Sequence, residues 1–356
     1  MLWKPRFIAV FIPAWDESLV IAPMLKATLK RFEHPDYRLF VGYYRNDPAT
    51  ASAIASVADP RIEPVEVPVD GPTTKADCLN HLYDALLTHE TTTGRSPIAI
   101  VLHDAEDVVH PFELTLFDQL IDRAALIQLP VQPLVDPAST WISGHYCDEF
   151  AESHGKELVV REAVGAAIPL AGVGCAIERH ALAKLAAAQE GRPFVGTSMT
   201  EDYEMGLRLG ALGFKTMFVR IPAQAGSYAV VSSRGHFPAS LDAAVRQKAR
   251  WIGGIAFAGW DRLGWQGGIG ERWMRMRSAT PRMMTARAKR SRSGFIRVVS
   301  RAPYWAPTTP PTSSSPASTM STDWVVTAWT TVVTALTARI ITRLVPMTTR
   351  AAMPRR

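Results

Sequence analysis

Short apolar runs alternate with stretches of helical spacing over the first 131 of the 356 residues. Several of these runs, such as 7–13 and 98–102, are apolar throughout, which is typical of strands buried on both faces of a sheet. The alternation predicts an α/β fold, with a doubly wound sheet flanked by helices. The predicted strands are 7–13, 37–44, 62–69, 98–102 and 125–131, and the predicted helices are 17–32, 49–58, 75–88 and 111–125.

Polar side chains follow several predicted strands at the point where each strand ends. Asp16 follows the first strand, Asn46 and Asp47 follow the second, and Asp104 follows the fourth. Ligands of open α/β sheets bind beyond the carboxyl ends of the strands. We therefore expect a binding site at this edge of the sheet.

An acidic cluster, His-Asp-Ala-Glu-Asp at 103–107, follows the apolar run 98–102 directly. The carboxylates of Asp104, Glu106 and Asp107 are hard oxygen ligands of the kind that Mg²⁺ or Mn²⁺ binds, and such an ion neutralises a diphosphate. The alternative is an acidic cap of the helix predicted to begin at Pro111.

A second motif is Thr-Lys-Ala-Asp-Cys-Leu-Asn at 74–80. Lys75 at the start of a helix can meet a phosphate, and Asp77 can meet a base or ribose. The alternative is an ordinary exposed first turn of a helix.

The third motif, Thr200-Glu201-Asp202, opens a predicted helix. Inversion at a sugar carbon by direct displacement needs a base for the proton of the acceptor hydroxyl, and Asp202 is the candidate. The alternative is helix capping by Thr200, with the two carboxylates favouring the helix dipole.

The fourth motif places Gln247, Arg250 and Trp251 on one face of a predicted helix at 241–259. Arginine can pair with a pyrophosphate, tryptophan offers a flat surface to a sugar ring, and glutamine can hydrogen-bond the sugar. The alternative is a structural contact between helices.

The chain changes character near Ser278. Residues 278–356 hold twelve Lys and Arg against one acidic residue, a net charge of +11, which leaves −5 on residues 1–277 of the chain's +6. The basic balance therefore belongs to the tail, and nucleic-acid binding is not expected. We predict a catalytic domain at 1–277 and a Thr-, Arg- and Pro-rich tail of low order at 278–356, a frame-shifted or truncated membrane region.

The four motifs occur in the order found in family 2 glycosyltransferases, and the chain resembles their processive, synthase-like branch over about residues 5–275. Within that branch, Asp-Ala-Glu-Asp and the stretch from His236 to Ile255 resemble the bacteriophage adsorption protein B group most closely. The resemblance implies a GT-A fold with a mixed sheet, a nucleotide-sugar donor, Mg²⁺ or Mn²⁺, and inversion at the anomeric carbon.

The resemblance also implies roles for single residues. It assigns Asp202 as general base and leaves open whether Glu106 or Asp107 binds the metal with Asp104, because the acidic motif here is Asp-x-x-Asp rather than the commoner Asp-x-Asp. It also assigns donor binding to Asp47, Asp77, Asp104 and Arg250, and acceptor binding to Gln247 and Trp251. Lys75 is expected to join the donor-binding residues and Glu201 the acceptor-binding ones.

The expected function is metal-dependent, inverting transfer of a sugar from a nucleotide-sugar to a glycan or lipid-linked acceptor. The expected location is the cytoplasmic face of the bacterial inner membrane, at the membrane surface or with a membrane partner protein. The alternative is a truncated, inactive scaffold or receptor-assembly component of a surface polysaccharide or phage adsorption system.

Overall fold

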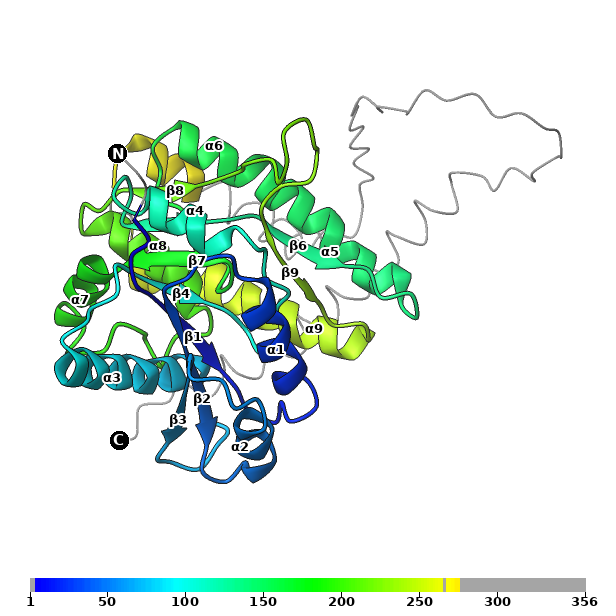
Figure 1. Cartoon of the computed structure of the whole chain (residues 1–356). Helices are drawn as coiled ribbons and strands as arrows, with labels where there is room; N and C mark the ends of the chain where they lie inside the picture. Colours follow the sequence, from blue (N-terminus) through cyan, green and yellow to red (C-terminus); the bar gives the residue numbers. More distant parts are fainter. Residues whose placement is uncertain (1–3, 265–266, 276–356) are drawn as a thin grey trace, which may run out of the picture. The chain divides into compact units, whose positions relative to one another are not determined.

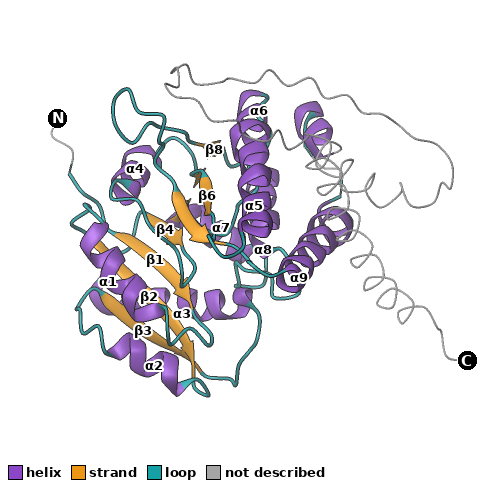
Figure 2. Ribbon diagram, turned by 90° about the vertical axis from the view of Figure 1, so that its right-hand side faces the viewer, coloured by secondary structure: helices purple, strands orange, loops and turns teal. Residues whose placement is uncertain are grey.

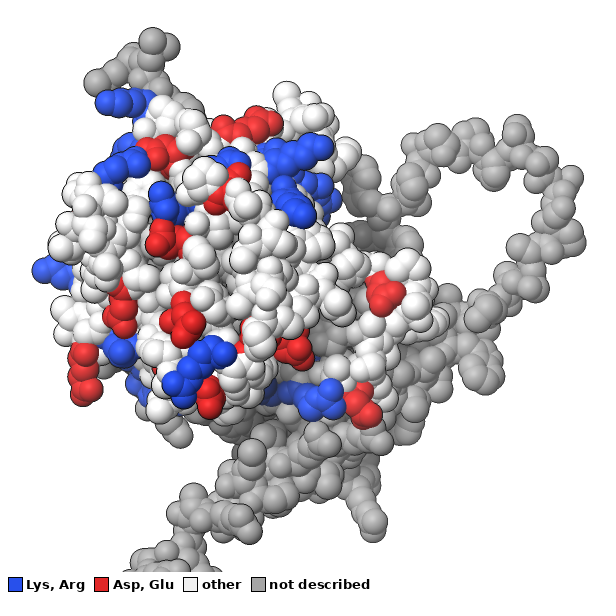
Figure 3. Space-filling view, turned by 60° about the horizontal axis from the view of Figure 1, so that its bottom comes forward, with Lys and Arg blue, Asp and Glu red and all other residues white. Residues whose placement is uncertain are grey.

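The computed structural model describes residues 4–264 and 267–275, all within one compact unit, Met1–Ala279. The predicted low-order tail at 278–356 lies outside the described residues. Within the described ranges, no helix has the length and apolar character needed to cross a membrane. On the face drawn in Figure 3, acidic and basic side chains are interspersed.

A seven-stranded mixed sheet forms the centre of the unit, in the order β3-β2-β1-β4-β7-β5-β8 (Figure 1). Every pair is parallel except those of β7, which runs antiparallel to both β4 and β5. This confirms the predicted mixed α/β sheet. The strands are β1 Ile8–Pro13, β2 Tyr37–Tyr44, β3 Ile62–Val67, β4 Ala99–Leu102, β5 Leu126–Gln128, β7 Cys175–Glu178 and β8 Thr216–Phe218.

Helices cover both faces of this sheet and bury a core on each side. The strand β1 shows why its sequence is apolar throughout: Ile8, Val10 and Ile12 enter one core, while Ala9 and Phe11 enter the other. Each large apolar side chain buried in this way contributes roughly 1.5–3 kcal/mol. The first core is covered by α1 Ile21–Arg31, α2 Pro48–Ala55 and α4 Glu113–Leu120, and the second by α3 Lys75–Thr93, α7 Arg179–Ala187 and α8 Glu201–Ala211.

A second, two-stranded parallel sheet joins β6 Val131–Leu134 to β9 Ser233–His236. Both strands are labelled in Figure 1, and β6 also in Figure 2. The predicted strand 125–131 is therefore wrong as a single element, because β5 pairs in the large sheet and β6 in the small one. Pro130 lies at the break, where its missing N–H cannot continue a ladder. The strand β9 was not predicted, since Ser-Arg-Gly-His has no apolar alternation.

Two long helical segments pack beside the small sheet. The first runs from α5 Thr140–Glu152 through a π-helix, η1 Ser153–Glu157, into α6 Leu158–Ala163. The second runs from α9 Leu241–Trp251 through η2 Ile252–Ala258 into α10 Gly259–Leu263. The second contains the helix predicted at 241–259, and the π-turns within the two segments were not predicted.

Candidate active site

One cavity of about 630 Å³ gathers residues from all four sequence motifs at the carboxyl-end edge of the sheet. Segments far apart in the chain meet here, because β4, α3, α8 and α9 all begin or end at this edge. The motif residues that line the cavity are Lys75, Asp104, Glu106, Asp107, Glu201, Asp202, Gln247, Arg250 and Trp251.

A smaller cavity of about 240 Å³ adjoins the first one at the ends of β1 and β2. Lys75, Asp104 and Glu106 line both cavities. The smaller cavity also has aromatic walls, since the rings of Trp15 and Tyr44 meet edge to face with centroids 5.2 Å apart. The charged groups thus lie between an aromatic recess and a larger polar space.

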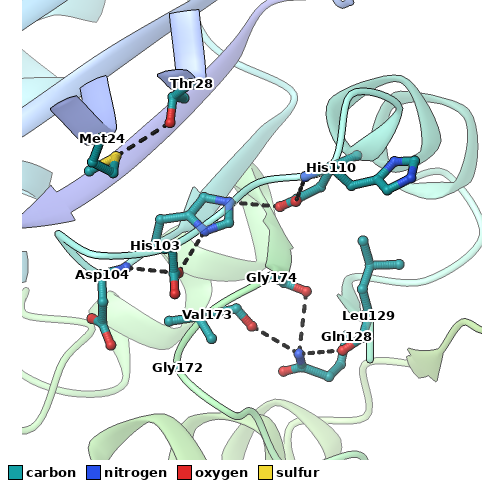
Figure 4. Close-up of polar contacts among 12 residues, drawn as sticks. Met24, Thr28, His103, Asp104, His110, Gln128, Leu129, Gly172, Val173 and Gly174 are labelled. Carbon is teal, nitrogen blue, oxygen red and sulfur yellow. Dashed lines mark hydrogen bonds and ion pairs between the residues drawn. The ribbon is translucent and has the colours of Figure 1, made fainter. Parts of the chain in front are cut away.

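A buried histidine fixes the acidic loop that follows β4 (Figure 4). His103 Nδ1 lies 2.9 Å from Asp107 Oδ2, and His103 Nε2 lies 2.7 Å from Glu113 Oε1. Burial lowers the pKa of His103, but Glu113 and Asp107 outweigh it and raise the pKa to about 10, so that the ring is an imidazolium. Asp107 Oδ2 also accepts from the amide of Asp104 at 3.0 Å, which turns this carboxylate oxygen toward the protein.

Asp104 and Glu106 remain directed at the cavities. The ammonium of Lys75 pairs with Asp104 and lies 3.4 Å from the carbonyl oxygen of Gly172. Burial raises the pKa of Glu106 to about 7, with further contributions from the carboxylates of Asp104 and Glu17. A positive group bound here would therefore find concentrated negative charge that one lysine neutralises in part.

Two neighbouring carboxylates begin α8. Burial raises the pKa of Asp202, although the positive charges of Lys75 and Arg250 act in the opposite direction. Burial and the charge of Asp202 raise the pKa of Glu201 to about 7. The hydroxyl of Thr200 makes no side-chain cap hydrogen bond to this helix. The pair thus supplies a carboxylate with raised proton affinity beside fixed positive charges, which is the environment of a general base.

A glycine loop before β7 forms the floor beneath Asp202. Gly172 has a φ of +80°, and a Cβ at this position would collide with Asp202 Oδ2. The loop is held by the buried Gln128, whose Nε2 donates to the carbonyl of Val173 at 3.0 Å (Figure 4). Its Oε1 accepts from the amide of Ala171 at 2.9 Å. Gln128 ends β5, and nothing in its sequence context singled it out.

Aromatic side chains fix the helix α9 that carries the fourth motif. The ammonium of Lys248 lies 4.3 Å from the ring centroid of Tyr146 and 4.5 Å from that of Trp251, and it pairs with Glu149. Within the described residues, the buried Gln247 Oε1 has no hydrogen-bond partner, and Gln247 lines the cavity. Trp251 therefore combines a structural contact with a place in the cavity wall.

The profile of the family described as "Glycosyltransferase like family 2" matches residues 5–254. The chain belongs to this family. It is 39% identical over 282 residues to bacteriophage adsorption protein B of Escherichia coli (strain K12) and to bacteriophage N4 adsorption protein B of Escherichia coli O157:H7. Each match covers 74% of the chain and 38% of the relative, so the chain spans about two fifths of the length of these relatives.

The solved structures include a mannosyltransferase with the same fold as this family 2 glycosyltransferase. PcManGT from Pyrobaculum calidifontis, in complex with GDP-Man and Mn²⁺, superposes with a TM-score of 0.55 at 14% identity. The match covers 96% of this chain and 87% of the mannosyltransferase. The GT-A fold implied by the motifs is therefore confirmed.

Two predicted donor-binding residues of the glycosyltransferase domain line neither of the two cavities. Both carboxylate oxygens of Asp47 accept backbone amides, that of Asp16 at 2.7 Å and that of Thr50 at 3.2 Å, so that Asp47 caps α2. Asp77 lies in the first turn of α3, 4.0 Å from His81. Their predicted roles require a ligand that reaches beyond the cavity walls.

The acidic loop of the glycosyltransferase presents carboxylates that suit a divalent cation. Among the described residues, no three or more His, Cys, Asp or Glu side chains converge as a ready-made metal site. Asp104 and Glu106 nevertheless offer two carboxylates at the junction of the cavities. This set fits Mg²⁺ or Mn²⁺ held by one or two carboxylates together with the oxygens of a substrate diphosphate.

Proposed function

We propose that this domain transfers a sugar, with inversion, from a nucleotide-sugar to a hydroxyl of a glycan or lipid-linked acceptor. The observation that carries the proposal is the presence of Asp202, Asp104 and Arg250 in one cavity. A base, a carboxylate that can hold a divalent cation and a positive side chain for the diphosphate are what such a displacement requires within reach of one another.

In the proposed complex, the donor lies across both cavities. Its nucleoside enters the smaller one, against Trp15 and Tyr44, and its diphosphate meets Lys75 at the junction. Asp104 and Glu106 would hold Mg²⁺ or Mn²⁺, which supplies charge neutralisation to the diphosphate when bound. Asp107 is proposed to support this loop through His103, because one of its oxygens already accepts two hydrogen bonds.

The transfer step follows from the groups in the larger cavity. Asp202 accepts the proton of the acceptor hydroxyl while the oxygen of that hydroxyl attacks the anomeric carbon. The bond from this carbon to the nucleoside diphosphate breaks on the opposite face. Lys75 and Arg250 stabilise the charge that develops on the leaving diphosphate. Glu201, Gln247 and Trp251 position the acceptor, for which the unpaired oxygen of Gln247 offers an acceptor to a sugar hydroxyl.

We place this reaction at the cytoplasmic face of the inner membrane, with a membrane surface or a membrane partner protein beside it. The name of the relatives, bacteriophage adsorption protein B, supports a role in the cell envelope. An acceptor that is itself lipid-linked or a growing surface glycan would be presented there.

The test is calorimetric titration of the full chain with a panel of nucleoside diphosphates, with and without Mn²⁺. We expect one nucleotide to bind in a metal-dependent manner, and Asp104→Ala to weaken that binding about tenfold or more. Asp122→Ala is the control, because the Asp122 side chain is 71% exposed and lines neither cavity. Absence of binding by the folded chain would contradict the proposal and favour the inactive scaffold.

A further inference from the structure

A third cavity, of about 450 Å³, lies next to the catalytic one. Val131 and Phe150 line both cavities, so that the two share a wall. The third cavity is lined by residues of β6 and of α5, and we call it the β6–α5 cavity. These two elements lie side by side (Figure 2). Its volume is within the range of small-molecule sites.

Two arginines give the β6–α5 cavity its charge. Arg220 follows β8 and Arg234 lies in β9, and both line the cavity. In the described part of the chain, neither guanidinium has an ion-pair partner, and no Asp or Glu lines this cavity. Two uncompensated guanidinium groups at one recess favour an anion, and their planar forks suit the paired oxygens of carboxylate and phosphate.

Neutral hydrogen-bond donors also line the β6–α5 cavity. His154 Nδ1 accepts from the amide of Val131 at 3.0 Å, and burial lowers the pKa of His154 to about 3, so that the neutral ring carries its proton on Nε2. The side chain of Gln132 accepts from the hydroxyl of Ser232 at 2.9 Å through Oε1, which leaves its amide N–H groups as donors. A negatively charged oxygen in this cavity would therefore meet charged guanidinium donors and neutral N–H donors.

The strand β9 connects the two cavities directly. Arg234 lines the β6–α5 cavity, whereas Gly235 and His236, which follow it, line the catalytic one. A Cβ at Gly235 would lie 3.3 Å from Asp107 Oδ1, which places this strand against the acidic loop. A ligand in the β6–α5 cavity can therefore extend toward the transfer site along one strand.

We propose that the β6–α5 cavity binds an anionic group, carboxylate or phosphate, of the acceptor that is glycosylated in the neighbouring cavity. This inference rests on the proposed function, because it names the class of acceptor: one that carries a negative charge beside the hydroxyl to be extended. Arg220 and Arg234 hold the charged group, while His154 and Gln132 donate to its oxygens.

The cavity contains its own reporter, the free thiol of Cys147. The other two cysteines, Cys78 and Cys175, are buried, whereas Cys147 is partly exposed, so Cys147 is the thiol that an alkylating reagent reaches. Labelling of Cys147 in the full chain by N-ethylmaleimide, followed by mass spectrometry, therefore measures access to the β6–α5 cavity. This assay needs no donor, metal or turnover.

The probes are glucose 6-phosphate, glucuronate and uncharged glucose, compared at constant ionic strength so that screening is the same in each. We expect at least one of the two anions to slow the labelling in a saturable manner and glucose to have no effect. Protection by glucose 6-phosphate alone identifies a phosphate-bearing acceptor, and protection by glucuronate alone identifies an acidic sugar.

The variants Arg220→Gln and Arg234→Gln should each raise the anion concentration for half-protection about tenfold or more, because each removes a charge-assisted hydrogen bond. Arg123→Gln is the matched control, an exposed arginine that lines none of these cavities, and it should leave protection unchanged. Equal protection by glucose, no protection by either anion, or protection that survives both substitutions would overturn the proposal. If any of these results occurs while the chain still binds a nucleotide in a metal-dependent manner, the anionic-acceptor proposal fails and the proposed glycosyltransferase function stands.

Discussion

The backbone of Gly172 lies against the carboxylate of Asp202, so closely that a side chain at residue 172 would occupy the space of Oδ2. The same residue offers its carbonyl oxygen to Lys75 at 3.4 Å. One glycine thus contacts the proposed base and the lysine that pairs with Asp104. The position of Asp202 therefore depends on this loop as well as on its own helix.

The first prediction concerns this contact. Gly172→Ala should lower the transfer rate about tenfold or more, because the added methyl displaces Asp202 from its position. It should also reduce stability by about 1 kcal/mol through the positive φ. The measurements are initial rates and urea denaturation.

Gly213→Ala is the matched control. Gly213 has a φ of +85°, and a Cβ there would meet nothing within 4 Å. The two variants therefore share the backbone strain and differ in the contact with Asp202. An equal loss of activity in both would contradict the importance of that contact.

The second prediction separates donor binding from transfer. Asp202→Asn keeps the shape of the side chain but cannot take a proton, so transfer should fall about 100-fold or more while nucleotide affinity stays within about twofold. Calorimetry and a transfer assay on the same preparation give both values. An equal loss of nucleotide binding would remove Asp202 from the role of base.

The third prediction concerns the anchor of the glycine loop. Gln128→Leu should lower the free energy of unfolding by roughly 2–3 kcal/mol, because it leaves the amide of Ala171 and the carbonyl of Val173 buried without their partner. Transfer should fall as well, since this loop supports Asp202. Gln224→Leu, at an exposed position, is the control and should change stability by less than about 0.5 kcal/mol. Wild-type stability in Gln128→Leu would show that the loop holds without this anchor.

The fourth prediction is a pH dependence of stability. Burial lowers the pKa of His154 to about 3 from an ordinary value of 6.5. Between these values the unfolded chain binds a proton that the folded chain does not, so this group's contribution to stability is present above about pH 6.5 and is lost as pH falls. Its slope is at most about 1.4 kcal/mol per pH unit.

Urea denaturation of the wild type and of His154→Gln at several pH values from 7 to 4 isolates this term from the carboxylates, which both proteins share. The difference in unfolding free energy between them should shrink as pH falls. A difference that is constant over this range would show that His154 titrates normally in the folded chain.

The layered fold was predictable because its signals are local. The strand at Tyr37–Tyr44 and the helix start at Lys75 are found as predicted, since an apolar run and the Thr74 cap act over a few residues. The pairing of β6 with β9 joins segments about a hundred residues apart, and no local pattern marks it.

The candidate site shows the same division. Motif order pointed to the residues that line the catalytic cavity. The groups that hold them, among them Gln128 and the buried trio of His103, Asp107 and Glu113, act through contacts between distant elements or deep burial. A glutamine or histidine has the same appearance in a sequence whether it is exposed or makes four hydrogen bonds in a core.

The reversed strand β7 has a consequence for how such a domain can diversify. Because Cys175, its first residue, pairs with Leu102 and Gln128 at the ends of β4 and β5, the segment before it enters the site from the edge that the parallel strands leave. That segment lies outside the ladders of the sheet, and the side chain of Gln128 holds it through Ala171 and Val173. The floor of the site is thus positioned by one side chain of β5, so a substitution at that residue can move the floor while the register of every strand stays the same.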